Sequence, residues 1–301
     1  MVNWRDSNLL RALCAAVLTV GFFAMIEAIL VVADDDWSAL YAGDPGHDWR
    51  LKADLDLPEV PHIEEGTNFA VQTNANGLRD DPIPAGGPWV LALGCSTTFG
   101  WGVDHPDVWT EVLQASLSMP VVNAGIPGHS TEQGMAWGKA LMQRGPSVVI
   151  LGWGLRDAQW TTLPDVQRRP ATFPRNTRLY RKLAQSLVGP SKGSVPRVGE
   201  ERFVQNMADM VAYARDRGIQ VLVLDMTGRS ETPSHGSALR RLDTPLVVPV
   251  VKDEDHFEND SIHLNIQGNR KLAGQLVEPV KALLSQSKPV PQPEQGLPQT
   301  P

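Results

Sequence analysis

Cysteine is scarce in this chain. The 301 residues include two, Cys14 inside an apolar segment and Cys95 at the end of another, and no Cys-x-x-Cys pair. No cysteine or histidine spacing typical of a zinc site occurs either. The sequence therefore predicts no disulfide framework, no metal site and no cofactor.

Net positive charge is lacking as well. Lysine and arginine number 27 against 34 aspartate and glutamate residues, which gives a formal net charge of −7 at pH 7. A chain with this balance repels the phosphates of nucleic acids. Nucleic acid is therefore not an expected partner.

The amino end carries a long apolar run. Ala12 to Ala33 is interrupted by a single charge, Glu27, and roughly 20 such residues cross a bilayer. Arginines precede the run and three aspartates follow it, an order that places the amino end in the cytoplasm. We expect residues 1–36 to be an uncleaved single-pass anchor in membrane lipid, with the rest of the chain outside the cytoplasm. A signal peptide cleaved after Val31-Val32-Ala33 is the alternative. Glu27 is either tolerated near the interface or binds a partner.

Two short segments carry residues suited to nucleophilic catalysis. The apolar run Trp89–Leu93 leads into Gly94-Cys95-Ser96, a pattern typical of a buried strand whose terminal turn presents a hydroxyl. Farther along, Asp260-Ser261-Ile262-His263 places a carboxylate three residues before an imidazole. A serine attacks well when a histidine takes its proton and a carboxylate orients that histidine. We therefore predict a triad of Ser96, His263 and Asp260.

Alternatives to these residues stay open. Cys95 could itself be the nucleophile, and Asp253 with His256 repeats the Asp-x-x-His spacing inside a charge run typical of a solvated loop. His129 either lines the pocket or enters a helix.

The motifs resemble those of the SGNH (GDSL-like) hydrolase superfamily, in the family's order, over roughly residues 73 to 283. The four similar blocks are Gly94-Cys95-Ser96, Asn123-Ala124-Gly125-Ile126-Pro127-Gly128, Gly154-Leu155-Arg156-Asp157 and Asp260-Ser261-Ile262-His263. Upstream, Thr73-Asn74-Ala75-Asn76-Gly77-Leu78-Arg79 is similar to the entry of a membrane-anchored bacterial branch.

The resemblance implies an oxyanion hole, and this sequence departs from the family's motifs at two positions. It implies that the N–H groups of Ser96 and Gly125 stabilise the oxyanion, together with a third-block asparagine. Arg156 stands at the asparagine's place, and Cys95 replaces the family's aspartate. An arginine donates hydrogen bonds, but its planar fork does not overlay an amide. Arg156 is thus either a substitute donor or a structural ion-pair partner.

Apolar strands alternate with amphipathic helices from Trp89 onward. The expected strands are 89–94, 121–124, 148–153, 221–224 and 246–251, and the expected helices are 107–118, 131–143 (with Ser130 as N-cap), 200–217 and 266–284. This alternation predicts an α/β fold, a three-layer sandwich around a parallel, roughly five-stranded, flavodoxin-like sheet. Ligands bind such sheets at the carboxyl ends of the strands, where Ser96, Gly125 and Arg156 fall.

Composition divides the rest of the chain. We expect an irregular membrane-proximal lead-in over 37–85 with one short strand at 69–73, an SGNH hydrolase domain over 86–286, and a disordered proline-rich tail over 287–301. A basic insert spans 160–198. Its stretch from Val166 to Val198 has no acidic residue and eight basic ones: Arg168, Arg169, Arg175, Arg178, Arg181, Lys182, Lys192 and Arg197. This insert either favours an anionic glycan or lipid headgroups, or is a solvated loop with a helix around 179–187.

The sequence thus predicts a membrane-anchored, exported serine esterase acting on O-acyl esters such as acylated glycans. Two alternatives stay open. An O-acyltransferase would use the same triad to pass the acyl group to a cell-surface polysaccharide. A scaffold or binding protein would be catalytically impaired because the third oxyanion donor is missing.

Overall fold

A computed structural model describes residues 4–33, 39–44, 48–162, 164–167, 177, 179, 180, 183, 195–227 and 234–287. The chain forms two compact units. One comprises residues 1–41 and 170–191, and the other comprises residues 42–169 and 192–301. Each is described by itself.

The first unit contains helix α1 (Trp4–Ala33). Its segment Asn8–Leu30 has a mean hydropathy of 2.3, and none of it is buried. The segment is long and apolar enough to cross a membrane, and a signal sequence near the amino end has the same properties. Within this unit the Glu27 carboxylate accepts a 2.9 Å hydrogen bond from the Leu179 N–H. Most of the basic insert, including most of its expected helix, lies outside the described residues.

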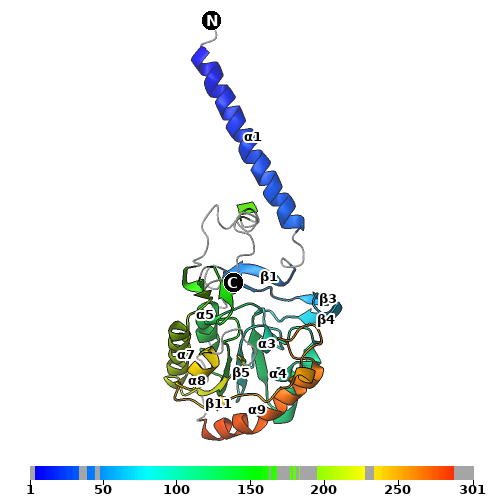
Figure 1. Ribbon diagram of the computed structural model, residues 1–301, viewed down its shortest axis with the longest axis vertical. Coiled ribbons are helices and arrows are strands. Elements are labelled where there is room, and N and C mark those ends of the chain that lie inside the picture. Colours follow the sequence, from blue (N-terminus) through cyan, green and yellow to red (C-terminus); the bar gives the residue numbers. More distant parts are fainter. Residues whose placement is uncertain are drawn as a thin grey trace. The chain divides into compact units, whose positions relative to one another are not determined.

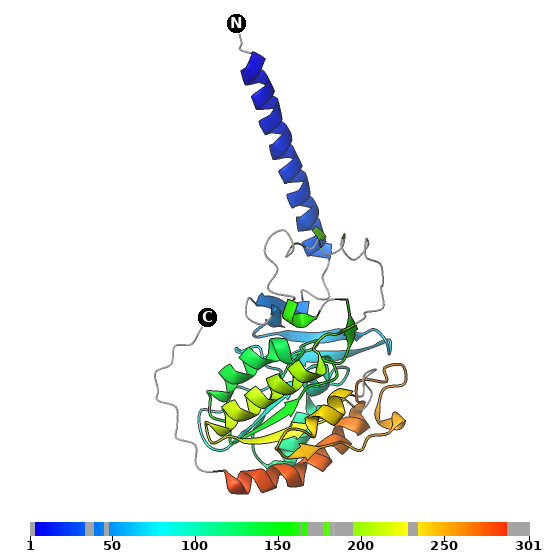
Figure 2. The ribbon, with the colours of Figure 1, turned by 60° about the vertical axis from the view of Figure 1, so that its left-hand side comes forward.

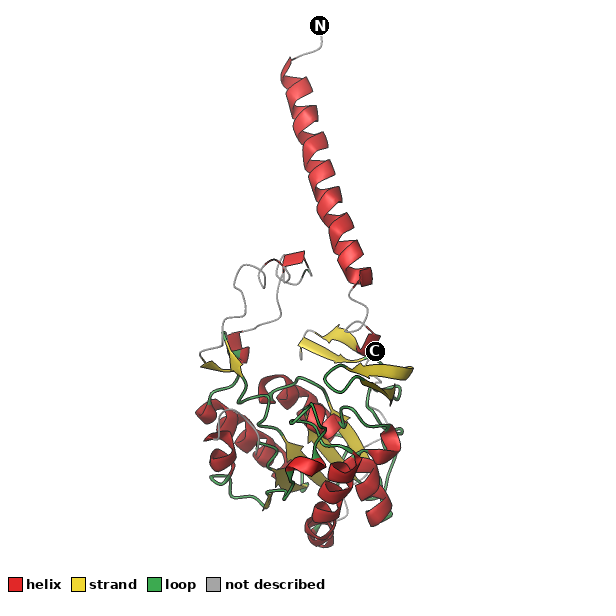
Figure 3. Cartoon of the chain, turned by 45° about the vertical axis from the view of Figure 1, so that its right-hand side comes forward, coloured by secondary structure: helices red, strands yellow, loops and turns green. Residues whose placement is uncertain are grey.

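The second unit is built on a five-stranded parallel sheet (Figures 1 and 3). In spatial order its strands are β11 (Leu246–Val247), β10 (Gln220–Leu224), β7 (Val148–Gly152), β5 (Val90–Gly94) and β6 (Val121–Gly125). The predicted parallel α/β sheet is confirmed. Strand order reverses between β5 and β7, the place where open parallel sheets bind their ligands.

Helices cover both faces of the sheet, as Figure 2 shows for green α5 and orange α9. Along β5, Leu91 and Leu93 pack in one apolar cluster with α5 (Thr131–Met142) and α7 (Glu200–Arg215). Val90 and Ala92 pack in the other, with α4 (Trp109–Leu117) and α9 (Ile266–Gln286). Alternate strand residues thus face opposite layers, which gives the predicted three-layer sandwich. Helix α5 begins after Ser130 in a capping box, as expected.

Residues 37–85 hold more regular structure than expected. Strands β1 (Tyr41–Asp44) and β2 (Asp48–Leu51) pair, and β3 (Asp56–His62) and β4 (Thr67–Gln72) form an antiparallel hairpin. The expectation of one short strand was therefore wrong. Other short elements are helix α8 (Ser234–Leu239), the β8 (Trp160–Thr161)–β9 (Val195–Pro196) pair, and three 3-10 turns: η1 (His105–Asp107), η2 (Asp165–Gln167) and η3 (Asp253–Asp255).

Candidate active site

Ser96 occupies the tight turn between β5 and the short helix α3 (Ser96–Phe99). The turn requires a glycine before it: a Cβ on Gly94 would lie 2.1 Å from the Thr98 hydroxyl oxygen and 2.7 Å from the Gly152 carbonyl oxygen. Strand β5 can therefore end directly against α3 and β7. This close packing fixes the position of Ser96 at the carboxyl edge of the sheet.

A buried arginine supports the same turn from the hairpin side. Arg79 is fully buried and donates hydrogen bonds to the carbonyls of Phe99 (3.0 Å), Gly100 (2.7 Å) and Ala70 (2.8 Å). Burial lowers its pKa to about 10. Because the end of α3 and strand β4 share one cation, the nucleophile turn and the hairpin are held together.

The predicted triad residues meet. The Ser96 hydroxyl lies 2.8 Å from His263 Nε2, and His263 Nδ1 makes a hydrogen bond with Asp260 Oδ2. A proton on Nδ1 donated to Asp260 leaves Nε2 as the acceptor that Ser96 requires. Ser96 and His263 are 1% and 7% exposed, so the proton transfer would take place away from bulk water.

Asp260 is held as an anion in a fixed orientation. Its Oδ1 accepts the N–H groups of Ile262 (2.9 Å) and His263 (3.2 Å), while Oδ2 accepts His263 and, at 2.9 Å, His62 Nε2. Burial raises the pKa of Asp260, but hydrogen bonds from both histidines and the charge of His263 outweigh burial and hold that pKa well below its ordinary value. An ionised carboxylate can fix the tautomer of His263 and stabilise the imidazolium formed during catalysis.

His263 is tuned toward the neutral form. Burial lowers its pKa, the Asp260 carboxylate opposes this, and the charge of Arg156 lowers it further. A general base must be unprotonated before it takes a proton. The environment thus favours the reactive form of His263.

The structure changes the predicted oxyanion donors. The Gly125 N–H already donates a 3.0 Å hydrogen bond to Asn123 Oδ1, so it is occupied and the role predicted for it is not supported. In the described part of the chain, the N–H groups of Ser96 and Gly128 donate no hydrogen bond. Ser96 is the first residue of α3, where backbone N–H groups lack helical partners. Gly128, with φ +83 in the loop after β6, takes Gly125's place as the second candidate.

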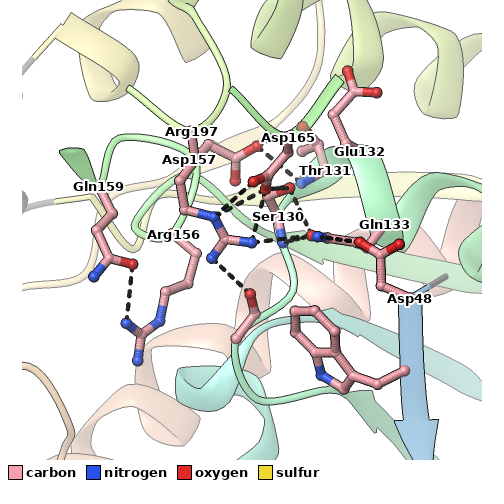
Figure 4. A network of polar contacts seen from close by, with 12 residues as sticks. Asp48, Ser130, Thr131, Glu132, Gln133, Arg156, Asp157, Gln159, Asp165 and Arg197 are labelled. Carbon is pink, nitrogen blue, oxygen red and sulfur yellow. Dashed lines mark hydrogen bonds and ion pairs between the residues drawn. The ribbon is translucent and has the colours of Figure 1, made fainter. Parts of the chain in front are cut away.

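Arg156 follows β7 and keeps its charge largely uncompensated. Among the described residues its guanidinium makes one hydrogen bond, 3.3 Å to Gln159 Oε1, and no ion pair (Figure 4). Its Nε is buried without a partner there. The neighbouring Asp157 is turned to Thr131, whose N–H it accepts at 2.9 Å. Because Arg156 also lowers the pKa of His263, its charge acts on the triad, and the structural ion-pair alternative gains no support.

The Gly128 loop is anchored by a second, buried arginine. Arg197 pairs with Asp165 at 2.7 Å, and Ser130 also donates to Asp165 (Figure 4). Arg197 donates a further hydrogen bond, of 2.8 Å, to the Gly128 carbonyl. Arg197 belongs to the basic stretch of the sequence, yet it is 8% exposed and neutralised. It is therefore a structural residue, which corrects its place in the expected substrate-facing or lipid-facing patch. The other seven basic residues of that stretch lie outside the described residues.

The alternative residues lie elsewhere. Cys95 is buried, with Sγ 3.4 Å from the Thr97 hydroxyl oxygen, and His263 Nε2 points to Ser96 rather than to it. His256 forms an antiparallel bridge with Leu264 after η3. The buried His129 bonds the Trp49 carbonyl at 2.9 Å, so it fixes the loop before α5.

One site residue escaped the sequence prediction entirely. His62, at the end of β3, is fully buried and shares Asp260 with His263. No spacing signal marks it, since it lies 198 residues from its partner. The ligand atoms of His62, Asp260 and His263 lie within 4.8 Å of one another, close enough to hold a metal ion. The observed contacts are explained as two hydrogen bonds to one carboxylate oxygen.

Comparison with known proteins gives limited similarity. No family model matches the sequence. No curated protein matches it either. Solved structures that are similar to this chain include a G-D-S-L family protein from Desulfitobacterium hafniense DCB-2 (16% identity, 64% of this chain and 99% of that one, TM-score 0.46), a psychrotrophic esterase from Pseudoalteromonas sp. (14%, 66% and 100%, 0.45), and a carbohydrate esterase family 2 enzyme from Corynascus thermopiles (14%, 73% and 73%, 0.45). At these identities and scores the likeness carries no assignment of activity. The chemistry is therefore argued from the site: a serine, a neutral imidazole and an oriented carboxylate able to perform acyl transfer.

Proposed function

We propose that this protein is an exported serine hydrolase that cleaves O-acyl esters. The observation that carries the proposal is the unbroken hydrogen-bond chain from the Ser96 hydroxyl through His263 to Asp260. A scaffold that had lost catalysis would not need this order in a buried site.

In the proposed reaction Ser96 Oγ attacks the acyl carbonyl while its proton passes to His263 Nε2. The N–H groups of Ser96 and Gly128 and the guanidinium of Arg156 stabilise the oxyanion. His263 then protonates the departing alcohol, and a water molecule activated by the same histidine releases the acid from Ser96. Asp260 stays ionised throughout.

The substrates we propose are small O-acyl esters and O-acylated glycans outside the cytoplasm. We propose that esters with a negative charge close to the ester bond are preferred, because the guanidinium of Arg156 has no ion-pair partner among the described residues. The sequence resemblance to the SGNH family implies the same substrate class.

The activity assay uses p-nitrophenyl acetate and acetylated xylan, each with and without a deacetylated polysaccharide acceptor. Without any acceptor, we expect both substrates to release one acetate for each ester bond that is cleaved. Acetyl transfer to the polysaccharide in place of acetate release would establish the acyltransferase alternative. No reaction under either condition, with folding verified by circular dichroism, would contradict the proposal.

Export is proposed on the apolar length and flanking charges of α1. A reporter that is active only in the cytoplasm, fused after Trp37, should be silent, whereas one that requires export should be active. Sodium carbonate should leave the protein in the membrane fraction if α1 stays attached. A mature amino terminus after Ala33 would replace the anchor with a cleaved signal, and an active cytoplasmic reporter would contradict export altogether.

A further inference from the structure

We propose that His62 is a positioning residue of the triad, delivered by the β3–β4 hairpin; this rests on the proposed function. The triad loop is held from the hairpin at two points. His62 Nε2 lies 2.9 Å from Asp260 Oδ2, and the Glu65 carboxylate accepts the N–H groups of Asn259 and, at 2.8 Å, Asp260. The hairpin thus fixes both the backbone and the side chain of Asp260.

The surroundings of His62 determine which nitrogen carries the proton. Its ring packs edge-on against Phe257 at 4.6 Å and Phe69 at 6.5 Å between centroids. Nδ1 is buried with no hydrogen-bond partner in the described part of the chain. On that side the backbone approaches closely, because a Cβ on Gly102 (φ +91) would lie 2.6 Å from Nδ1. A proton on Nδ1 would therefore be buried without an acceptor, which fixes the proton on Nε2, facing Asp260.

A second donor on Asp260 Oδ2 restricts the carboxylate in a way that a single donor does not. With His263 and His62 on one oxygen and two backbone N–H groups on the other, rotation of the carboxylate breaks at least one hydrogen bond. The His263 ring is thereby held with Nε2 against the Ser96 hydroxyl. Such preorganisation lowers the barrier to proton transfer without any contact between His62 and the substrate.

Three variants test this role. His62→Leu removes the donor and keeps the site apolar. His62→Gln places an amide N–H near the position of Nε2. Val60→Ala, in the buried face of the same strand, perturbs the hairpin without touching the triad, and it is the matched control for loss of stability.

We expect His62→Leu to lower kcat on p-nitrophenyl acetate at least about tenfold, the loss typical of one hydrogen bond to a charged group, with KM unchanged. Besides its burial, the groups that act on His263 are Asp260, Arg156 and His62. In His62→Leu the Asp260 Oδ2 atom loses one of its two side-chain donors, which strengthens its hold on the proton of His263. The acid limb of kcat/KM should therefore move to higher pH in His62→Leu. His62→Gln should recover most of kcat, and Val60→Ala should lower the melting temperature while leaving kcat and the acid limb in place.

The inference is contradicted if folded His62→Leu keeps the wild-type kcat and acid limb, or if Val60→Ala reproduces both of its changes. If His62→Leu does not fold, His62→Gln decides: a kcat near wild type supports the role of the donor, and a loss equal to that of an inactive triad variant contradicts it. A failure of the proposed function is distinguishable, because the wild-type protein itself would then show no ester hydrolysis.

Discussion

His263→Ala is expected to lower kcat on p-nitrophenyl acetate by about 10⁶, and Asp260→Asn by about 10⁴. The first change removes the only group within hydrogen-bonding distance of the Ser96 hydroxyl among the described contacts. The second leaves the imidazole in place but offers it an amide, which favours the wrong tautomer. Steady-state kinetics at pH 8 measure both losses.

Combination of these two changes provides an internal check. Residues that act as one unit are not additive, so His263→Ala with Asp260→Asn should be no slower than His263→Ala alone. The melting temperature of each variant identifies losses that come from unfolding. Wild-type turnover in folded His263→Ala would remove this residue from the mechanism.

Arg156→Ala is expected to lower kcat/KM by about 10²-fold, the typical effect of one lost oxyanion donor. Stability should stay nearly unchanged, because Arg156 has only a 3.3 Å hydrogen bond to Gln159 and no ion pair in the described residues. Arg156→Asn, which places an amide there, should keep or raise the rate. Hydrolysis of p-nitrophenyl acetate and thermal melts measure the two quantities separately.

Removal of Arg156 should also change the pH dependence of kcat/KM. Its charge lowers the pKa of His263, so removing it should raise that pKa, and the acid limb of kcat/KM should move to higher pH. Arg202→Ala is the matched control, since Arg202 is an exposed arginine paired with Glu132 at 2.6 Å. It should leave both the rate and the limb unchanged. A large fall in melting temperature for Arg156→Ala with unchanged kinetics would make Arg156 a structural residue.

The sheet was predictable because parallel strands covered on both faces are continuous apolar runs. β5 and β7 are buried at every position, and the sequence marks both plainly. The β3–β4 hairpin lacks this signal. Strand β3 contains Pro58 and Pro61, and most of its residues are exposed. Prolines argue against a strand inside a sheet, yet a two-stranded hairpin accommodates them.

The site was predictable where residue type alone carries the chemistry. A serine after a strand and an Asp-x-x-His loop are visible in the sequence, and the structure brings them together. Availability of a backbone N–H is not visible, because it depends on local partners such as the Asn123 side chain that occupies the Gly125 N–H. The role of His62 depends on a contact across 198 positions, which no local pattern encodes.

The most direct test of the central claim is intact-mass and peptide analysis after incubation with a fluorophosphonate, which reacts covalently with an activated serine. One adduct per wild-type chain is expected, located at Ser96, with none in Ser96→Ala and slow formation in His263→Ala. Cys95→Ala should react like wild type, because the Cys95 thiol of the wild-type protein is buried beside Thr97. No adduct in the folded wild-type protein, or an adduct that persists in Ser96→Ala, would contradict the account.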